Sequence, residues 1–353
     1  MRHQRPADQG AVALVDRFLP VKRQAVGVFR HGDISQQPFG ACATALKPIH
    51  ELIRAHVLAG ERLHADDTTV PLLARGATKE ARLWTYVRDD RPFAGVAAPA
   101  AVFHFSADRQ MVHPNQHLSG WKGTLQADAY SGYNDLYRMD RSPGPVTNAL
   151  CWSHARRKLF ELADIAGNVR KGKAAHEISP LTLEAVTRID ALFAIERGIN
   201  GKPAGERRAA RQEQARPLVD DLHGWLTAQR AQMSRHNPVA KAIDYMLGKQ
   251  GQWEAFTRFL DDGRICLTNN AAERALRGIA LGRKAWLFAG SQRGGERAAF
   301  IYSLIVTAKM NNIDPQAWLA DVLERMPALP VSRLPELLPW NWRTAGHAKQ
   351  QAA

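Results

Sequence analysis

Residues 62–73, with the sequence RLHADDTTVPLL, mark the point at which the chain changes from helical to strand-like patterns. Two more β-prone segments follow, ARLWTYVR at residues 81–88 and AAVFHFS at residues 100–106. Breaks that contain glycine or proline separate the three segments, as is typical of consecutive antiparallel strands. The first strand is predicted to run from Leu63 to Leu73.

Two shorter strands are expected further along the chain. One covers residues 123–129 and ends at Asp128, and the other covers residues 146–152 and leads into a helix that begins near Ser153. Strands interleaved with helical segments predict a mixed α/β domain.

Helical patterns dominate the remaining sequence. Residues 1–58 are expected to form short helices, and residues 164–260 form an all-helical insertion without strand signals. The α/β domain therefore consists of residues 59–163 and 261–312, and residues 313–353 form a helical tail. Apolar residues at helical spacing predict individual helices over residues 11–15, 43–58, 183–193, 218–226, 239–247 and 315–325, the last begun by Asp314 and Pro315.

The charge balance suits a nucleic-acid partner but does not identify one. The 353 residues include 48 Lys and Arg against 34 Asp and Glu, a formal charge of +14. Such an excess is expected of a protein that neutralises phosphates. A basic protein without any nucleic-acid partner is an equally good explanation of the charge.

The cysteines and the N-terminal sequence argue against export. Cys42, Cys151 and Cys266 are far apart and form no C-x-x-C pair, so neither a disulfide framework nor a zinc ribbon is indicated. No apolar signal-peptide core begins the chain, and the longest apolar stretch, near residues 298–306, is too short to span a bilayer. We expect a cytoplasmic protein without membrane contact.

Two acidic positions lie in the predicted strands. Asp66 and Asp67 are adjacent, and successive strand residues point to opposite faces, so only one can join a given site. A turn or edge position is the alternative role for an aspartate in such a segment. Asp128 ends an apolar strand, where a carboxylate is costly unless a cation or donor compensates it. Capping of the following turn is the alternative for Asp128.

A third acidic position lies on a predicted helix. Glu273 shares one stripe of this helix with Asn270, Arg274 and Arg277, at spacings of three and four residues. The alternative is a solvated ion pair between Glu273 and Arg277, which contributes little. Apolar neighbours favour a helix packed on the sheet with this polar stripe at its edge.

Other residues suggest binding sites with less support. For the basic residues after the fifth strand, and for Arg283 with Lys284, a basic solvent face is the alternative to any binding role. His113 and His117 have H-x-x-x-H spacing, but no cysteine pair accompanies them, which favours a loop or core role over zinc binding. Residues 290–295, GSQRGG, lack the Gly-Lys-Ser/Thr ending of a phosphate loop, so nucleotide binding is rejected.

Five motifs occur in order along the chain: LHADDTTV (63–70), GTLQADAYSGY (123–133), CWSHARRK (151–158), TNNAAERALR (268–277) and LPWNW (338–342). Together they resemble the transposases of the IS66 family of bacterial insertion sequences, which are DDE transposases. The resemblance runs from about Leu14 to Arg343. It selects Asp66 over Asp67, because Asp67 stands where the family pattern Asp-Glu-Thr has its glutamate.

The resemblance implies an RNase H-like catalytic domain in which Asp66, Asp128 and Glu273 are catalytic and hold metal. Three such carboxylates can hold two divalent ions, which clamp the attacking and leaving oxygens of a phosphodiester. Mg²⁺ is the expected ion, and Mn²⁺ is a possible substitute. The residues expected to contact DNA are His154, Arg156, Arg157, Lys158, Asn270, Arg274, Arg277, Arg283 and Lys284.

The implied activity is hydrolysis at the ends of a mobile element, followed by strand transfer into target DNA. The alternatives are a non-catalytic DNA-binding remnant of such a transposase and a stand-alone RNase H-like nuclease. Expected partners are element and target DNA, further copies of the chain and accessory proteins of the same element, with the protein at the bacterial nucleoid. Family members usually carry an upstream zinc-binding recognition module, and this chain begins after that region, so we expect DNA binding with little sequence preference.

Overall fold

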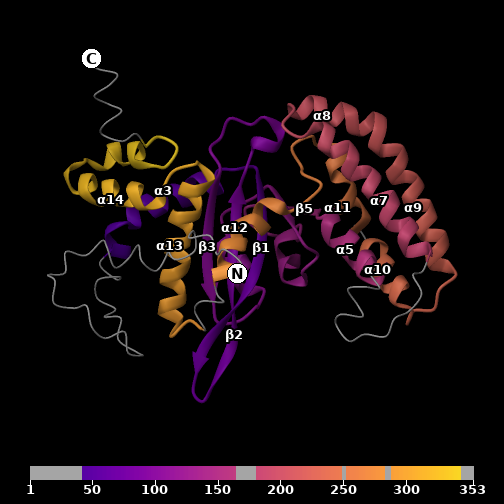
Figure 1. Cartoon of the computed structure of the whole chain (residues 1–353), viewed down its shortest axis with the longest axis horizontal. Coiled ribbons are helices and arrows are strands. Elements are labelled where there is room, and N and C mark those ends of the chain that lie inside the picture. Colours follow the sequence, from indigo (N-terminus) through magenta and orange to yellow (C-terminus); the bar gives the residue numbers. More distant parts are fainter. Residues whose placement is uncertain (1–41, 164–179, 249–251, 283–287, 343–353) are drawn as a thin grey trace, which may run out of the picture.

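A sheet of five strands forms the centre of the computed structural model, which describes residues 42–163, 180–248, 252–282 and 288–342 (Figure 1). Its order is β3-β2-β1-β4-β5. β1 pairs antiparallel with β2, and β2 with β3, whereas β1 with β4 and β4 with β5 are parallel. β1 is therefore the central strand. The strands are β1 (Arg62–Ala74), β2 (Ala77–Arg88), β3 (Ala100–Ser106), β4 (Thr124–Ala127) and β5 (Thr147–Leu150).

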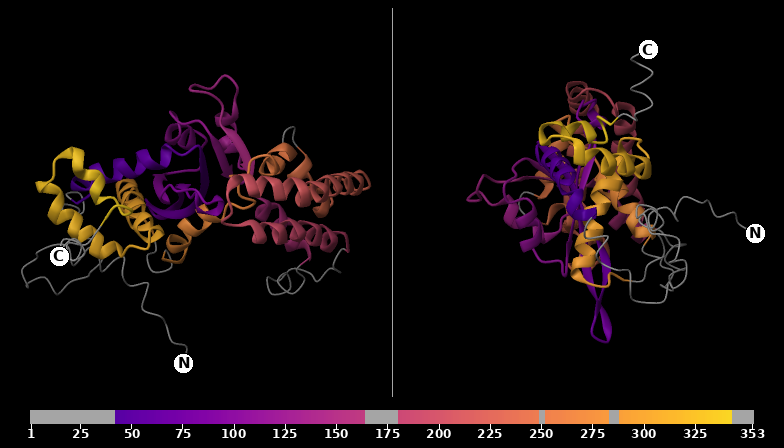
Figure 2. Two further views of the ribbon diagram at one scale, coloured as in Figure 1. Left: turned by 90° about the horizontal axis from the view of Figure 1, so that it is seen from above. Right: turned by 90° about the vertical axis from the view of Figure 1, so that its left-hand side faces the viewer.

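Helices surround this sheet and extend from it on both sides (Figure 2). The predicted mixed α/β class is confirmed. The α-helices of the described residues are α3 (Lys47–Leu58), α4 (Val112–His117), α5 (Trp152–Ala163), α7 (Pro180–Ile199), α8 (Ala204–Ala210), α9 (Arg216–Ala231), α10 (Pro238–Leu247), α11 (Gln252–Thr257), α12 (Asn270–Gly282), α13 (Gln292–Met310) and α14 (Pro315–Arg325).

The two faces of β1 are covered by different helices. Ala65 belongs to a core that includes Ile53 of α3, whereas Val70 belongs to a second core that includes Ala272 of α12. This separation follows from the alternation of side chains along a strand. Even-numbered residues of β1 therefore share a face with α12.

The outer edge of the sheet is closed by side chains of α13. The hydroxyl of Ser303 accepts a hydrogen bond from the backbone N–H of Phe103 at 2.9 Å, and Thr307 Oγ1 accepts one from Ala101 at 3.1 Å. The Thr307 hydroxyl also donates to the carbonyl of Ala101. These bonds satisfy edge groups of β3 that would otherwise be available for pairing with another chain.

A separate helical region lies beside β5 (Figures 1 and 2). Its described part comprises α7 to α11, packed with α5 around a core that includes Ile189, Leu222, Ile243 and Phe256. The predicted helices over residues 183–193, 218–226 and 239–247 correspond to α7, α9 and α10. α8, the π-helical turn Arg211–Ala215 and α11 were not predicted.

The C-terminal helix begins as its sequence predicts. Asp314 caps α14 by accepting a hydrogen bond from the N–H of Ala317 at 2.7 Å, and Pro315 is the first helical residue. Trp318 of this helix is buried and donates from Nε1 to the carbonyl of Leu337 at 2.8 Å. Within the described ranges, no helix has both the length and the apolar character needed to cross a bilayer.

Several predicted boundaries were wrong by a few residues. β4 ends at Ala127, so Asp128 lies just beyond the strand, and β5 is shorter at both ends than residues 146–152. α5 begins at Trp152, as the predicted start near Ser153 requires. α3 begins at Lys47, where Pro48 occupies the first turn, and the predicted helix at residues 11–15 lies outside the described residues.

Candidate active site

Asp66 lies on the central strand of the sheet, on the face that α12 covers. The strand contains His64, Asp66 and Val70 on this face by alternation, and Val70 packs with residues of α12. A central position excludes the edge-strand alternative for Asp66. Its Oδ1 accepts a hydrogen bond from the backbone N–H of Asp67 at 2.8 Å.

Asp128 is next to Asp66 by strand register. His64 pairs with Gln126 across the parallel β1 and β4, and two residues further along each strand come Asp66 and Asp128. The pairing of β1 with β4 ends at His64, so the strands part where the two carboxylates begin. Asp128 Oδ1 also accepts a hydrogen bond from the N–H of Tyr130 at 3.2 Å, so the turn-capping alternative describes a bond that does form.

Glu273 lies in the first turn of α12 and faces α5. Its Oε1 is 3.9 Å from His154 Nε2 and 4.0 Å from Arg157 Nη2. Among the described residues, its ion pairs therefore cross to α5 and do not follow α12 to Arg277. Glu273 Oε1 is buried and has no hydrogen-bond partner in the described structure.

The three carboxylates interact electrostatically. Burial, and repulsion by Asp128, Asp67 and Glu273, raise the pKa of Asp66 from 3.8 to about 7, against the lowering effect of the Asp67 N–H. The structure thus brings Asp66 within electrostatic range of both Asp128 and Glu273. Repelling carboxylates of this kind favour either a proton or a bound cation. A divalent cation with oxygen ligands would relieve the repulsion, so the donor set fits Mg²⁺ or Mn²⁺.

Asp67 has a different environment from Asp66. Its carboxylate is 2% exposed, and it accepts hydrogen bonds from Arg82 Nη1 at 3.1 Å and Arg109 Nη2 at 2.7 Å. Arg109 also lies 3.9 Å from Asp128 Oδ2 and stacks over the ring of Tyr130 at 3.9 Å. Arg109 was not predicted, because no local pattern around it indicates contact with residues 42 positions earlier in the chain.

A buried polar network fixes α12 against β1. Arg62 Nη1 donates to Nε2 of His64, so Nδ1 carries the proton and donates to Asn269 Oδ1 at 3.0 Å. Asn269 Nδ2 donates in turn to the carbonyl of Ala65 at 2.8 Å. Burial and nearby Arg62 lower the pKa of His64 to about 3, so its ring is neutral. Asn269 lies just before α12, and the network therefore sets the position of Glu273 relative to Asp66.

The residues of this network were not assigned a role from the sequence. His64 and Asn269 both occur in the quoted motifs, but they are 205 positions apart, and nothing local predicts their contact. The placement of Arg62 and His64 at the start of the first strand is a signal that could have been noticed, since both residues are costly to bury without partners.

The residues expected to contact DNA occupy different environments. Arg156 forms a two-bond pair with Asp190 of α7, at 2.5 and 2.8 Å, and this pair occupies its guanidinium. Lys158 lies 4.5 Å above the ring of Tyr245. His154 and Arg157 lie beside Glu273, and Arg274 lies 3.7 Å from Asp89. Asn270 and Arg277 are exposed, and Arg283 and Lys284 lie outside the described residues.

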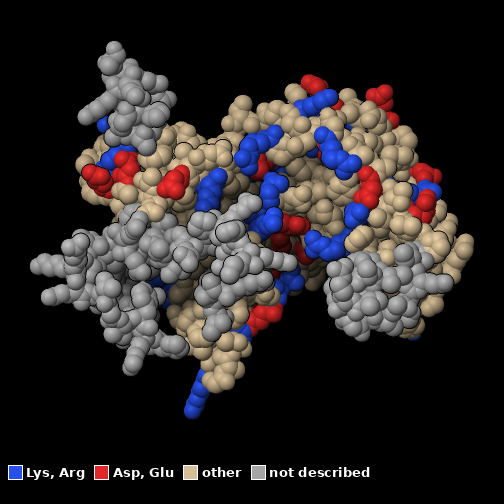
Figure 3. Space-filling view, viewed as in Figure 1, with Lys and Arg blue, Asp and Glu red and all other residues tan. Residues whose placement is uncertain are grey.

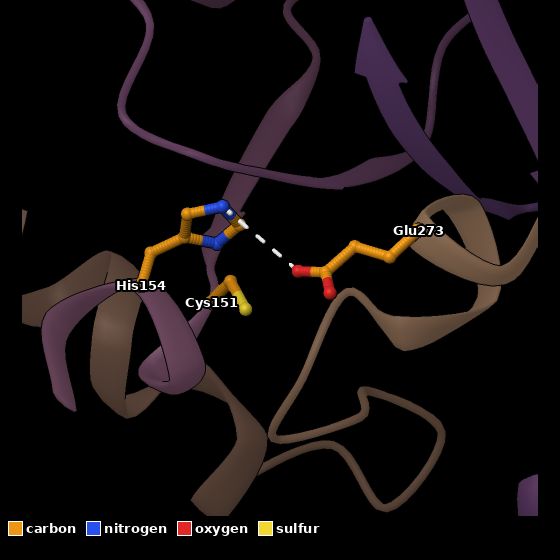
Figure 4. Close-up of side chains that lie close together, drawn as sticks. All are labelled: Cys151, His154 and Glu273. Carbon is orange, nitrogen blue, oxygen red and sulfur yellow. Dashed lines mark ion pairs between the residues drawn. The ribbon is translucent and has the colours of Figure 1, made fainter. Parts of the chain in front are cut away.

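Cys151 joins His154 and Glu273 in a compact cluster (Figure 4). One potential ligand atom from each of the three lies within 4.8 Å of the others. Cys151 is buried, and burial raises the pKa of its thiol to about 11, although N–H groups of Asn269 and His154 lower it. From the sequence, Cys151 was placed in the CWSHARRK motif but was given no role as a ligand.

The two rejected sites have structural roles. His113 binds Asp108 at 2.6 Å, and His117 Nδ1 is 3.0 Å from the hydroxyl of Tyr86, so each ring has its own partner. In residues 290–295, Ser291 caps α13 by accepting a hydrogen bond from the N–H of Gly294 at 3.0 Å.

Residues 11–297 match the family described as Transposase IS66 family, and residues 303–340 match the IS66 C-terminal element. The first match covers all five strands of the described sheet and Asp66, Asp128 and Glu273. The two matches together account for most of the chain.

Three similar proteins come from Sinorhizobium fredii (strain NBRC 101917 / NGR234). Uncharacterized protein y4hP is 52% identical over 347 residues, covering 96% of this chain and 62% of the relative. Uncharacterized proteins y4jD and y4qI are 36% and 35% identical, covering 84% and 92% of this chain and 57% and 60% of each relative. The chain thus spans about 60% of the length of these relatives. The chain belongs to the IS66 transposase family.

Proposed function

We propose that this chain carries the catalytic centre of a DDE transposase, which cleaves DNA at element ends and joins them to target DNA. The observation that carries the proposal is the convergence of three carboxylates, Asp66 on β1, Asp128 just beyond the parallel β4 and Glu273 in the first turn of α12. They are close enough that, together with burial, Asp128 and Glu273 raise the pKa of Asp66. A folded protein retains such repulsion at a cost in stability, and a functional site is the common reason for that cost.

The three carboxylates of the proposed centre would bind metal from different elements. Asp66 from β1 and Asp128 beyond β4 bind from the sheet, and Glu273 binds from α12. Two bound Mg²⁺ ions would activate the attacking oxygen and stabilise the leaving oxygen. Arg109, which links Asp67 to Asp128, holds the Asp128 side of the site in position.

The sheet order supports an RNase H-like catalytic domain. Three antiparallel strands followed by two parallel ones place β1 beside β4, and this adjacency brings Asp66 next to Asp128. In this proposal the helical region between α5 and α12 is an insertion into that domain. Its Tyr245 hydroxyl accepts a hydrogen bond from the N–H of Ala129, the residue after Asp128, and this position near the site would let the region contribute to DNA binding.

Basic side chains near the carboxylates would hold the DNA backbone. Figure 3 shows Lys and Arg side chains around a central hollow, with acidic atoms inside it. Arg157 and Arg277 are both exposed. Arg157 lies on α5, which Glu273 faces, and Arg277 lies on α12, which carries Glu273. Phosphate contacts of this kind supply salt-sensitive affinity and fix the register of the DNA. Joining two element ends would require at least two copies of the chain.

Cleavage of plasmid and element-end DNA by single variants tests the proposal. We expect Asp66→Ala, Asp128→Ala and Glu273→Ala each to lower Mg²⁺- or Mn²⁺-dependent cleavage by at least about a hundredfold, because positioning the ions contributes several kcal/mol. Asp140→Asn is a matched control, because Asp140 is exposed and pairs only with nearby Arg138 among described residues.

Two outcomes would contradict the proposal. Full cleavage by any of the three variants would remove that residue from the site. DNA binding by the wild type without metal-dependent cleavage of any substrate would favour the non-catalytic remnant. Asp67→Ala, which would otherwise serve as a neighbouring control, is unsuitable because it removes the carboxylate that Arg82 and Arg109 share.

A further inference from the structure

The cluster of Cys151, His154 and Glu273 differs in chemistry from the acidic cluster beside it. Cys151 lies between β5 and α5, His154 lies in the first turn of α5, and Glu273 approaches from α12 (Figure 4). Their potential ligand atoms all lie within 4.8 Å of one another. Thiolate, imidazole and carboxylate are the ligand types that zinc uses in proteins.

Two polar atoms of the cluster have no hydrogen-bond partner. His154 Nδ1 and Glu273 Oε1 are both buried, and neither has a hydrogen bond within the described structure. The ion-pair distances from Glu273 Oε1, 3.9 Å to His154 and 4.0 Å to Arg157, are too long for hydrogen bonds. Buried polar atoms are normally paired, so two unpaired ones in the same cluster indicate that a ligand binds between His154 and Glu273.

The surroundings of Cys151 favour a thiolate only when a cation is bound to it. Its sulfur accepts a hydrogen bond from the N–H of Asn269 at 3.1 Å, and it lies at the N-terminal end of α5, where negative charge is favoured. Burial outweighs these effects and raises the pKa of the thiol to about 11. A divalent ion would displace the thiol proton to solvent and form the metal–sulfur bond.

We propose that Cys151, His154 and Glu273 form a second metal site, which takes a thiophilic divalent ion such as Zn²⁺. Tetrahedral zinc needs ligand atoms about 3.5 Å apart, so the side chains must close in by roughly 1 Å. The fourth position is left for water or a substrate oxygen. Mg²⁺ is disfavoured here, because it prefers oxygen ligands.

The site shares Glu273 with the proposed catalytic centre. A consequence that rests on the proposed function is that Zn²⁺ at Cys151 and His154 competes with the catalytic ions for this carboxylate. Low concentrations of Zn²⁺ should therefore inhibit Mg²⁺-dependent cleavage. The binding site itself can be tested without any cleavage assay.

Cobalt titration of the purified full chain is the direct test, because Co²⁺ replaces Zn²⁺ and gives a thiolate-to-cobalt charge-transfer absorption when sulfur binds it. We expect this band in the wild type, its loss on addition of Zn²⁺, and its absence in Cys151→Ser. Cys42→Ser should keep the band unchanged. His154→Ala, in which the side chain is only partly buried, should weaken Co²⁺ binding at least tenfold, with circular dichroism to verify folding.

The outcomes separate this site from the proposed activity. Absence of the band in the wild type, or its persistence in Cys151→Ser, overturns the metal site even if the acidic cluster proves catalytic. A band that requires Cys151, together with weaker binding in folded His154→Ala, supports the site even if no DNA cleavage is found. Unchanged Co²⁺ affinity in His154→Ala would exclude His154 as a ligand and contradict the proposal.

Discussion

Glu196 in the helical region and Asp66 in the central strand are both partly buried carboxylates. The neighbours of Glu196 are positively charged, whereas those of Asp66 are negatively charged. Glu196 accepts hydrogen bonds from Arg211 at 2.6 and 2.9 Å and from Arg207 at 3.3 Å. Asp66 is surrounded instead by carboxylates, which raise its pKa to about 7. The first arrangement satisfies its charges internally, and the second is satisfied only by a proton or an added cation.

The arginines beside Glu196 are also bound to backbone. Arg211 Nη1 donates to the carbonyl of Phe259 at 2.8 Å, and Nη2 donates to that of Ile265 at 2.8 Å. Residues 259–265 lead from the helical region back toward α12, so this network ties the two parts of the chain together. The arginine cluster around Glu196 therefore stabilises the fold, whereas the carboxylates around Asp66 bind metal in our proposal.

Breaking the arginine cluster around Glu196 should give the largest loss of stability. Arg211→Met leaves Glu196 with a partly unpaired buried charge, and we expect the free energy of unfolding to fall by about 3–5 kcal/mol in denaturant titrations. Arg188→Met is the matched control, because the Arg188 pairs with Glu184 and Asp221 are largely exposed and should contribute at most about 1 kcal/mol. Equal effects of the two substitutions would contradict the structural role of the Glu196 cluster.

Removing the charge of Asp66 should instead raise the free energy of unfolding. The folded-state pKa of Asp66 is about 7 against 3.8 for the free group, so the folded protein holds a proton that the unfolded chain releases between these values. Stability without metal should therefore fall as pH rises from about 4 to 7. We expect Asp66→Asn to be more stable than the wild type at pH 8 by about 2–4 kcal/mol.

The pH dependence supplies the control for this prediction. The difference between Asp66→Asn and the wild type should shrink toward zero below about pH 3, where the wild-type carboxyl is mostly protonated in both states. Thermal or denaturant unfolding in a chelator would measure it. A variant less stable than the wild type at pH 8 would show that Asp66 has a compensating cation within the folded chain.

The smallest expected effect concerns DNA binding outside both clusters. Arg277→Ala removes one exposed cation on the stripe that contains Glu273, so affinity for duplex DNA should fall severalfold and the salt slope by about one. Arg333→Ala, which removes an exposed arginine paired with Glu336, should leave both unchanged. Fluorescence anisotropy over a range of salt concentrations distinguishes the two. An unchanged slope in Arg277→Ala would place the DNA elsewhere.

The sequence predicted most of the strands and the start of α14 well, because their signals are local. β3 has the predicted bounds, and α14 begins with the capping aspartate and proline that predicted it. Boundaries failed where the signal was weak, as at β4, which stops one residue before Asp128. The helical region was predicted by periodicity, but the arginine network that joins it to the sheet was not.

The candidate site was predicted less completely. Resemblance selected Asp66, Asp128 and Glu273, whereas composition and spacing left each with a structural alternative. Arg109 and Asn269 were missed because their roles depend on contacts between distant parts of the chain. Only the fold brings these residues together, so no local pattern could indicate them.

Binding of Mn²⁺ to the purified chain, followed by the electron paramagnetic resonance of the free ion, tests the central claim most directly. Asp66→Asn and Asp128→Asn are the diagnostic variants, because neither residue belongs to the Cys151 cluster. We predict that the wild type binds Mn²⁺ at about two sites, and that both substitutions lower its affinity or stoichiometry while Asp140→Asn does not. Mn²⁺ binding that is the same in the wild type and in both diagnostic variants would contradict the assignment of these carboxylates as metal ligands.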